Sequence, residues 1–126
     1  MIVRVGTDLV AVDRMEKSIE KESFVRKVFH PNEIAYCRSK ARPASSFAAR
    51  FAAKEAFFKA LGTGLYTQGM GTQDVWVENA DNGRPLLMLS AAAENLLQQL
   101  GGSSRCDVSL AHDGNFATAT VVILAI

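Results

Sequence analysis

The sequence is most strongly patterned between residues 50 and 62, where it reads Arg50-Phe-Ala-Ala-Lys-Glu-Ala-Phe-Phe-Lys-Ala-Leu-Gly62. This stretch continues an apolar stripe that begins near Ser45, with phenylalanine, alanine and leucine recurring at the spacing of one helix face. Gly62 is the residue type that commonly ends a helix, and further glycines follow it up to Gly71. We therefore predict a long central helix over residues 45–61, followed by a glycine-rich loop.

Strands and shorter helices are predicted on both sides of this central helix. Upstream, the sequence indicates a strand over residues 2–7 that ends at Gly6-Thr-Asp8, a helix over 11–20, helical spacing over 24–29, and a helix from Pro31 that fades near Arg42-Pro43. Downstream, it indicates a hairpin of 74–78 and 86–89, a helix from Ser90 to Gly101-Gly102, and a hairpin of 106–112 and 116–126. We expect an α+β fold in which a small antiparallel sheet wraps against the long helix.

Length and composition exclude several classes of protein. With 126 residues, 48% of them hydrophobic and 21% charged, the chain suits one folded domain, and we take residues 1–126 as that domain. Cys37 and Cys106 lack the spacing of a zinc site or a disulfide framework. No apolar stretch reaches the roughly eighteen residues that span a bilayer. These features predict a cytoplasmic protein that is neither secreted nor inserted into a membrane.

The last predicted strand is apolar or small on both faces. One face carries Ala117, Ala119, Val121 and Ile123, and the other carries Phe116, Val122 and Leu124. In so small a protein, a strand that is buried on both sides predicts helices against one face and a neighbouring subunit against the other. We therefore expect the chain to self-associate.

The net charge of +1 conceals an uneven distribution. Residues 14–59 hold eleven Lys or Arg and five Glu, a balance of +6, whereas the rest of the chain holds three basic and eight acidic residues, a balance of −5. Such a chain can present a cationic face to phosphates or to an acidic partner. The alternative is a solvated helical surface with pairs of opposite charge one turn apart.

Two carboxylates are candidates for chemistry. The sequence contains neither a P-loop nor a G-x-G-x-x-G motif, so the common nucleotide sites are not indicated. Asp8 ends the first predicted strand, where it is also a good turn residue. Glu55 lies on or beside the apolar stripe, so it must be paired, protonated or bound to a cation. A structural pair with Lys59, one turn later, is the simpler interpretation of Glu55 taken alone.

The combination of these residues is more informative than each of them. Two carboxylates are too few for Ca²⁺, but they suit Mg²⁺, which keeps several waters and completes its coordination with substrate phosphate oxygens. A lysine beside such an ion can stabilise charge on a phosphoryl group, and the N–H groups of a glycine loop bind phosphate. Asp8, Glu55, Lys59 and the loop after Gly62 therefore indicate a diphosphate site.

Four motifs follow one another along the chain. They are Gly6-Thr-Asp-Leu-Val10, then Arg50-Phe-Ala-Ala-Lys-Glu-Ala56 with Lys59-Ala60 and Gly62-Thr-Gly64, then Asn82-Gly-Arg-Pro85, and finally Ser109-Leu-Ala-His112. In this order and at these distances, they make the sequence resemble the stand-alone holo-acyl-carrier-protein synthases, the short class of 4′-phosphopantetheinyl transferases. The resemblance covers essentially the whole chain. The last motif departs from the Ser-Ile-Ser-His that is familiar in the family.

The resemblance implies a 4′-phosphopantetheinyl transferase fold and transfer of the phosphopantetheine arm of coenzyme A to a serine of apo-acyl-carrier protein, in fatty acid biosynthesis. It implies release of adenosine 3′,5′-bisphosphate and Mg²⁺ as the cofactor, with Asp8 and Glu55 as metal ligands and Glu55 and Lys59 as catalytic residues. It also implies a homotrimer with active sites at the subunit boundaries. The residues that it associates with coenzyme A are Arg50, Gly62, Thr63, Gly64 and His112.

Some of these roles have alternatives. Arg50 can be an ordinary arginine on a helix surface, and His112 can be a core or interface histidine. The proton of the acceptor serine can pass to Glu55 or to a metal-bound water. The residues alone do not choose between these two acceptors.

A basic surface is predicted for the carrier protein. Arg14, Lys17 and Lys21 are three and four residues apart, so they share one face of the first predicted helix. The resemblance implies that an acidic acyl-carrier protein docks on this face. Charge complementarity would speed their encounter and fix the register of the complex.

Two other classes of protein fit parts of the sequence. A hot-dog thioesterase or dehydratase also wraps a sheet around a long helix, but it needs no Mg²⁺, so a chelator distinguishes the two enzymes. A nucleic-acid-binding module would use the basic helices. However, the aromatic residues are mostly phenylalanines at core spacing and do not alternate with basic residues as a stacking surface requires. We therefore expect no nucleic-acid partner.

Overall fold

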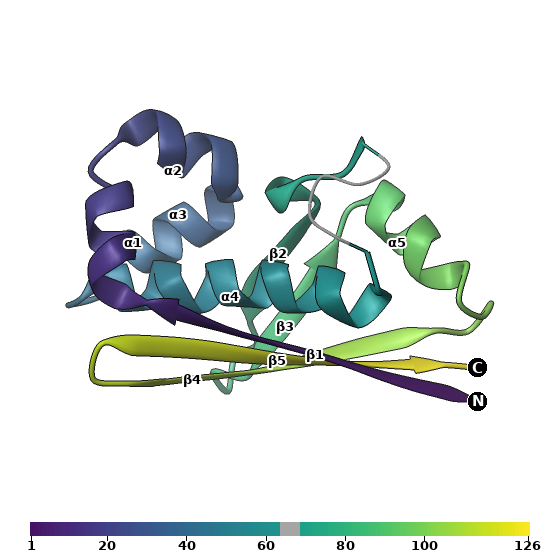
Figure 1. Cartoon of the computed structure of the whole chain (residues 1–126). Helices are drawn as coiled ribbons and strands as arrows, with labels where there is room; N and C mark the ends of the chain where they lie inside the picture. Colours follow the sequence, from purple (N-terminus) through teal and green to yellow (C-terminus); the bar gives the residue numbers. More distant parts are fainter. Residues whose placement is uncertain (64–68) are drawn as a thin grey trace.

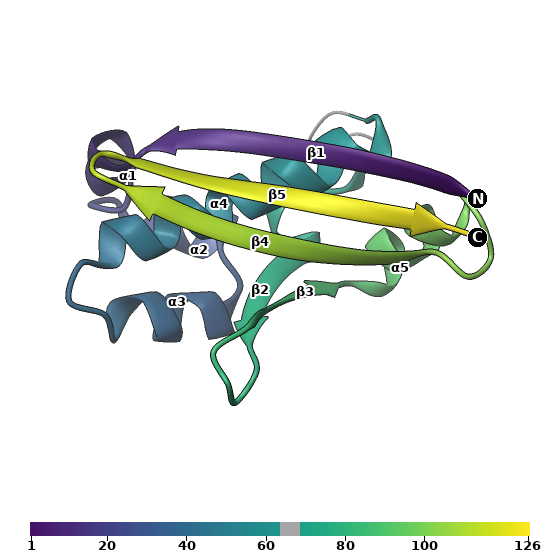
Figure 2. The same cartoon turned by 90° about the horizontal axis from the view of Figure 1, so that it is seen from below.

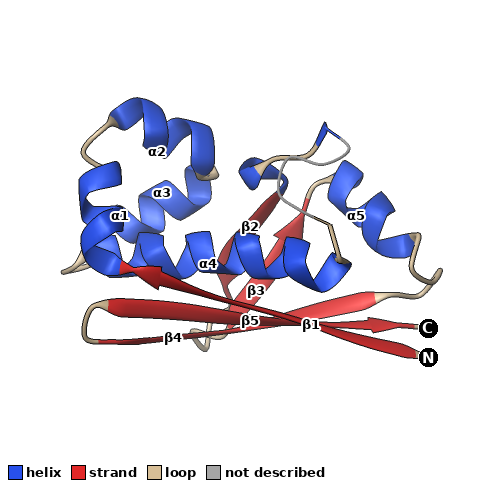
Figure 3. Cartoon of the chain, in the orientation of Figure 1, coloured by secondary structure: helices blue, strands red, loops and turns tan. Residues whose placement is uncertain are grey.

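Long strands lie under one long helix in the computed structural model, which describes residues 1–63 and 69–126 (Figures 1 and 3). The strands are β1 (Ile2–Ala11), β2 (Val75–Asn79), β3 (Pro85–Leu89), β4 (Arg105–Asp113) and β5 (Phe116–Ala125). The helices are α1 (Val12–Ser18), α2 (Glu22–Val28), α3 (Pro31–Arg38), α4 (Pro43–Leu61) and α5 (Ala91–Gln98), with a short 3₁₀ helix η2 (Thr72–Asp74). This is the α+β class that the sequence predicted.

Strands from the two ends of the chain form the larger sheet. Its order is β1-β5-β4 and both pairings are antiparallel, so β5 is central and the two termini lie side by side (Figure 2). Asp8 of β1 is opposite Ala119 of β5. β2 and β3 form a separate antiparallel pair. The predicted hairpins and antiparallel pairing are confirmed, but the strands are divided between two sheets.

The centre of the core is α4. Pro43 occupies its first turn, and Gly62 follows its last residue with a left-handed φ of 84°. Its small and aromatic side chains, among them Ala52, Ala56 and Phe57, are fully buried. The long central helix is thus confirmed. Neither it nor any other helix in the described part of the chain is long and apolar enough to cross a membrane.

Two groups of smaller elements pack on α4. The helices α1, α2 and α3 lie over its N-terminal half, and β2, β3 and α5 lie toward its C-terminal half (Figure 1). The first group builds a buried cluster that includes Phe29 and Phe47. The second contributes to a larger cluster that includes Phe58 and Leu97. α4 therefore connects two parts of one core.

Several elements begin or end elsewhere than the sequence predicted. β1 continues through Asp8 to Ala11, because its pairing with β5 runs across the predicted turn. Asp8 is therefore inside the strand and not at its end. The first helix ends at Ser18, and Lys21 is already the N-cap of α2. The helix that begins at Pro31 ends at Arg38, before the predicted position near residue 42.

β5 has the two different faces that were expected. The residues of the face toward α4 are Ala117, Ala119, Val121 and Ile123, all buried. The opposite face of the sheet exposes apolar side chains of β1 and β5. We call this the outer sheet face, and its large exposed residues are Val3, Val5, Leu9, Phe116 and Val122. Large apolar side chains that are exposed together on one face are typical of an interaction surface.

Candidate active site

The candidate site forms where β1 crosses α4. Gly6 lets the two backbones approach, since a side-chain carbon at this position would lie 2.0 Å from the backbone oxygen of Ala56 and 2.7 Å from the backbone nitrogen of Ala60. Asp8 lies two residues further along β1, and side chains alternate along a strand. Its carboxylate is therefore on the side of β1 that faces α4.

The neighbouring strand holds the Asp8 backbone in place. The Thr118 hydroxyl of β5 donates a hydrogen bond to the backbone oxygen of Asp8 at 2.8 Å. The Thr7 hydroxyl donates to the backbone oxygen of Ala119 at 3.1 Å. These side-chain bonds add to the strand pairing and fix where the carboxylate leaves the sheet.

Lys59 joins Asp8 across this crossing. Its ammonium group donates to the Asp8 carboxylate at 3.1 Å and to the backbone oxygen of Thr7 at 3.2 Å. The Lys59 side chain is 55% exposed and the Asp8 side chain 18% exposed. The structural Glu55–Lys59 pair is wrong, because the carboxylate that Lys59 contacts is Asp8.

Glu55 supplies the second carboxylate of the site. It lies on α4 one turn before Lys59 and is half-buried. Burial raises the pKa of Glu55, the negative charge of Asp8 raises it further, and the Lys59 ammonium opposes both effects. The carboxylates of Asp8 and Glu55 therefore repel each other, which a bound cation would relieve.

The two carboxylates fit a magnesium ion that is shared with a substrate. Over residues 1–63 and 69–126, no group of three or more His, Cys, Asp or Glu side chains could hold a metal. Mg²⁺ commonly uses one or two carboxylates, and waters and substrate phosphates complete its coordination. Asp8 and Glu55 match that pattern and do not match a metal cage made by the protein alone.

A cavity of about 470 Å³ opens beside the carboxylates. Asp8 and Glu55 line it together with Arg14 of α1. Its apolar lining includes Met15, Phe24 and Phe51. The cavity thus combines two acids, one exposed cation and an apolar wall.

The predicted basic surface is only partly formed on one helix. Arg14 and Lys17 are exposed on α1. Lys21 is also exposed, but it lies beyond the end of α1, because the chain turns between Ser18 and Lys21 before α2 begins. The prediction that all three residues share one helix face is therefore wrong. Of the three, Arg14 lines the cavity.

Arg50 and His112 line a different cavity. Arg50 is only 3% exposed, so its interpretation as a surface arginine is wrong. Its guanidinium carbon lies 4.1 Å from the centre of the Tyr36 ring, and it donates to the side-chain oxygen of Asn79 at 2.9 Å. His112 is exposed near the end of β4, so it is not a core histidine. These residues form a second polar surface. Tyr36 and Asn79 also belong to it, but nothing in the sequence indicated that they lie beside Arg50.

The two cavities face different sides of α4. Each residue advances about 100° around a helix, so Arg50 and Glu55 project about 140° apart. The structure therefore does not bring Arg50 and His112 together with the carboxylates of one chain.

The loop after α4 begins close to the site. The N–H of Gly62 donates to the backbone oxygen of Lys59, and that of Thr63 donates to the backbone oxygen of Phe58. These bonds tie the start of the loop to the helix end. Among the described residues, the buried Thr63 hydroxyl has no hydrogen-bond partner. Gly64 lies outside the described residues.

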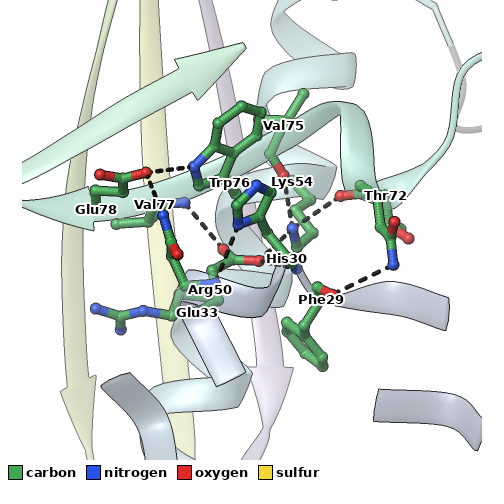
Figure 4. Close-up of polar contacts among 12 residues, drawn as sticks. Phe29, His30, Glu33, Arg50, Lys54, Thr72, Val75, Trp76, Val77 and Glu78 are labelled. Carbon is green, nitrogen blue, oxygen red and sulfur yellow. Dashed lines mark hydrogen bonds and ion pairs between the residues drawn. The ribbon is translucent and has the colours of Figure 1, made fainter. Parts of the chain in front are cut away.

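Sequence reasoning missed a buried ion pair that α4 makes one residue before Glu55 (Figure 4). The Lys54 ammonium lies 2.6 Å from the Glu33 carboxylate of α3, and both side chains are 0% exposed. Along the sequence, both belong to the mostly basic region of residues 14–59. The one available signal was the run of alanines around Lys54, which indicates a helix that is buried on most sides.

Comparison with known proteins gives a consistent result. Residues 4–121 match a family model described as 4′-phosphopantetheinyl transferase superfamily. The holo-(acyl-carrier-protein) synthase of Geobacter sp. (strain M21) is 43% identical over 125 residues, 98% of each chain. The Chronobacterium ammoniagenes ACPS-CoA complex has a TM-score of 0.87 at 26% identity, covering 100% of this chain and 99% of that chain. A holo-(acyl-carrier-protein) synthase from Bacillus anthracis str. Ames, in complex with CoA (3′,5′-ADP), has a TM-score of 0.81 at 31% identity, with coverage of 100% and 99%.

Proposed function

Because this chain belongs to the 4′-phosphopantetheinyl transferase superfamily and, within it, to the holo-(acyl-carrier-protein) synthases, we propose that Asp8, Glu55 and Lys59 form its reaction centre. The chain is a transferase that moves phosphopantetheine from coenzyme A to apo-acyl-carrier protein in fatty acid biosynthesis. The hot-dog and nucleic-acid interpretations are therefore wrong. The observation that carries the proposed centre is the meeting of two carboxylates and a lysine where β1 crosses α4.

Asp8 and Glu55 are the residues that would hold Mg²⁺. Their mutual repulsion and their two-carboxylate chemistry support this assignment. An ion held there would offset the negative charge of the coenzyme A diphosphate, which repels a nucleophile. We also infer that residues 1–126 form a single domain and that the enzyme is cytoplasmic.

Lys59 and Glu55 carry the protein's part of the transfer. The serine oxygen of the carrier forms a bond to the phosphorus next to pantetheine, and the bond from that phosphorus to the bridging oxygen breaks. Adenosine 3′,5′-bisphosphate leaves with the bonding electrons. Lys59 is exposed enough to donate to the leaving phosphate, where it stabilises the developing charge. Glu55 accepts the serine proton, because its carboxylate lines the cavity that Arg14 of the proposed carrier surface also lines.

Coenzyme A is proposed to bind between copies of the chain. The surface with Arg50 and His112 and the surface with Asp8 and Glu55 face different sides of α4, so one ligand meets both where two copies adjoin. The apolar outer sheet face supplies a surface for such an assembly. We assign Gly62, Thr63 and Gly64 to the same ligand and a homotrimer to the enzyme. A stable monomer in sedimentation at micromolar concentration would contradict this assembly.

The acidic carrier protein is proposed to dock on the side of α1. Arg14 is exposed and shares a cavity with Asp8 and Glu55, so a carrier held there presents its serine to the reaction centre. Lys17 on α1 and Lys21 at the start of α2 extend the positive charge beyond the cavity. Opposite charges on the two proteins would steer the encounter.

The test is to incubate the enzyme with Mg²⁺, coenzyme A and apo-carrier and to measure the mass of the carrier. We expect a gain of one phosphopantetheine group, which EDTA abolishes. Asp8→Asn and Glu55→Gln should each slow the gain by about 100-fold or more, because each removes a carboxylate that would hold Mg²⁺ at the reacting diphosphate. Glu94→Gln, at an exposed acid of α5, is the matched control and should react normally. Full activity of folded Asp8→Asn or Glu55→Gln would refute the proposed centre.

A further inference from the structure

The Lys54 ammonium uses all of its hydrogen bonds inside the core (Figure 4). It lies 2.6 Å from Oε1 of Glu33, and it donates to the backbone oxygens of Thr72 at 2.8 Å and Val75 at 2.6 Å. A lysine has three donors and no acceptor, so this group is saturated. Its three partners belong to α3, η2 and β2.

The Glu33 carboxylate is saturated by the same part of the fold. Its Oε1 also accepts from the backbone N–H of His30 at 3.1 Å, and its Oε2 accepts from the backbone N–H of Val77 at 2.9 Å. One fully buried pair therefore connects α3, α4, η2 and β2 at a single point. The hydrogen bonds and the ion pair of these two side chains do not involve Asp8, Glu55 or Lys59.

Lys54 and the β1 contact hold α4 from roughly opposite sides. At about 100° per residue, Lys54 and Ala56 project about 200° apart, with Glu55 between them. On the side of Ala56, Gly6 brings the backbone of β1 against the helix. Glu55 thus leaves α4 between two fixed points and reaches the cavity that it shares with Asp8.

The alanines around Lys54 do not fix the rotation of α4 by themselves. Ala52, Ala53 and Ala56 are fully buried, but their short side chains give the helix a smooth surface. The buried rings of Phe57 and Phe58 limit larger rotations of α4. Small rotations are limited by the three bonds of Lys54, because hydrogen bonds weaken steeply with poor distance and angle.

We propose that Lys54, through its buried ion pair with Glu33, is a positioning residue that sets the rotation of α4 and so holds the Glu55 carboxylate beside Asp8. This inference rests on the proposed function, because it concerns the pair assigned to the metal. Lys54 contacts neither the metal nor coenzyme A in this assignment. It acts on the reaction only through Glu55.

The test is a double variant, Glu33→Gln with Lys54→Met, which removes both buried charges at similar volume and leaves neither unpaired. Binding of Mn²⁺ to the enzyme with coenzyme A is measured by electron paramagnetic resonance, beside the Mg²⁺ dependence of turnover. We expect the Kd for Mn²⁺ and the KM for Mg²⁺ to rise about tenfold. A purely structural role would reduce the folded fraction and leave both constants of that fraction unchanged, and this result overturns the proposal.

Three further variants make the result decisive. Lys27→Met, at an exposed lysine of α2, is the control and should keep the wild-type Kd. Glu33→Asp retracts the carboxylate by one methylene, and a wild-type Kd in this variant also overturns the proposal if the double variant does not fold. Glu55→Gln tests the metal site itself. If it binds Mn²⁺ normally, the proposed reaction centre fails. If it loses binding while the double variant keeps the wild-type Kd, only the positioning role is refuted.

Discussion

Two lysines of α4, five residues apart, each contact a carboxylate, but in opposite surroundings. Lys54 and Glu33 are both 0% exposed, whereas Lys59 and Asp8 are 55% and 18% exposed. Burial lowers the pKa of Lys54, and the charge of Glu33 opposes that shift. The buried pair has every hydrogen bond satisfied within the chain, while the open pair can exchange its contacts for those of a substrate. The same two residue types therefore stabilise the fold in one place and serve the chemistry in the other.

The largest expected effect separates the two lysines by stability. Lys54→Met leaves the Glu33 charge buried without its partner, which should lower the free energy of unfolding by about 3–5 kcal/mol. Lys59→Met removes a pair whose lysine is 55% exposed, so its cost should stay near or below about 1 kcal/mol. Urea unfolding of both variants measures the difference. Equal losses in the two variants would contradict the prediction that the buried pair contributes more to the free energy of unfolding than the exposed pair.

The second effect concerns catalytic activity, where the Lys59 variant should lose more than its small loss of stability suggests. Lys59→Met should lower kcat by about 100-fold to 1,000-fold, because a charge on the leaving phosphate is no longer stabilised. Its melting temperature should remain close to that of the wild type. Carrier mass gain with saturating coenzyme A measures kcat. A folded Lys59→Met enzyme with normal kcat would remove Lys59 from the reaction centre.

A smaller effect is expected where the open pair borders the proposed carrier surface. Arg14→Glu should raise the KM for the acidic carrier by about tenfold and flatten its salt dependence, because a steering charge is reversed. The KM for coenzyme A should not change. Lys27→Glu gives the same charge reversal at an exposed position outside the cavity, and its KM for the carrier should rise much less. Equal responses of the two variants would contradict docking at Arg14.

The smallest effect concerns the proton on Glu55 in the metal-free enzyme. Its pKa is raised by burial and by Asp8, so the folded chain holds this proton more tightly than the unfolded chain. Glu55 therefore makes the unfolding free energy fall as pH rises from the usual glutamate range through the raised pKa. Glu55→Gln should remove this contribution in urea unfolding across that range. In Asp8→Asn, carboxyl NMR titration should give a lower pKa for Glu55, and an unchanged pKa would exclude their coupling.

Local patterns in the sequence were sufficient for much of the fold. The periodicity before Gly62 predicted α4, and alternation around turn residues predicted both hairpins. The break after Ser18 was not visible, because the residues on both sides of it have helical spacing. Asp8 was assigned to a turn since Gly-Thr-Asp favours one, but pairing with β5 keeps it in the strand.

The parts of the site that the sequence did not reveal depend on contacts between distant residues. Glu33 and Lys54 belong to different helices, and each resembles a solvated helix charge when only its neighbours are considered. Arg50 is likewise buried by the ring of Tyr36 and the amide of Asn79, which come from α3 and β2. Asp8, Glu55 and Lys59 could be predicted because they belong to motifs whose spacing is visible in the sequence, whereas contacts between distant residues are not.

α4 presents Arg50 to one side and Glu55 to another. In the proposed trimer, each such helix therefore serves two reaction centres at once and completes neither of them alone. A chain substituted at Arg50 keeps the carboxylates of Asp8 and Glu55, and a chain substituted at Glu55 keeps the surface with Arg50 and His112. Two alleles that are each inactive should thus complement one another when their products assemble together, because one boundary in the mixed particle joins two undamaged halves.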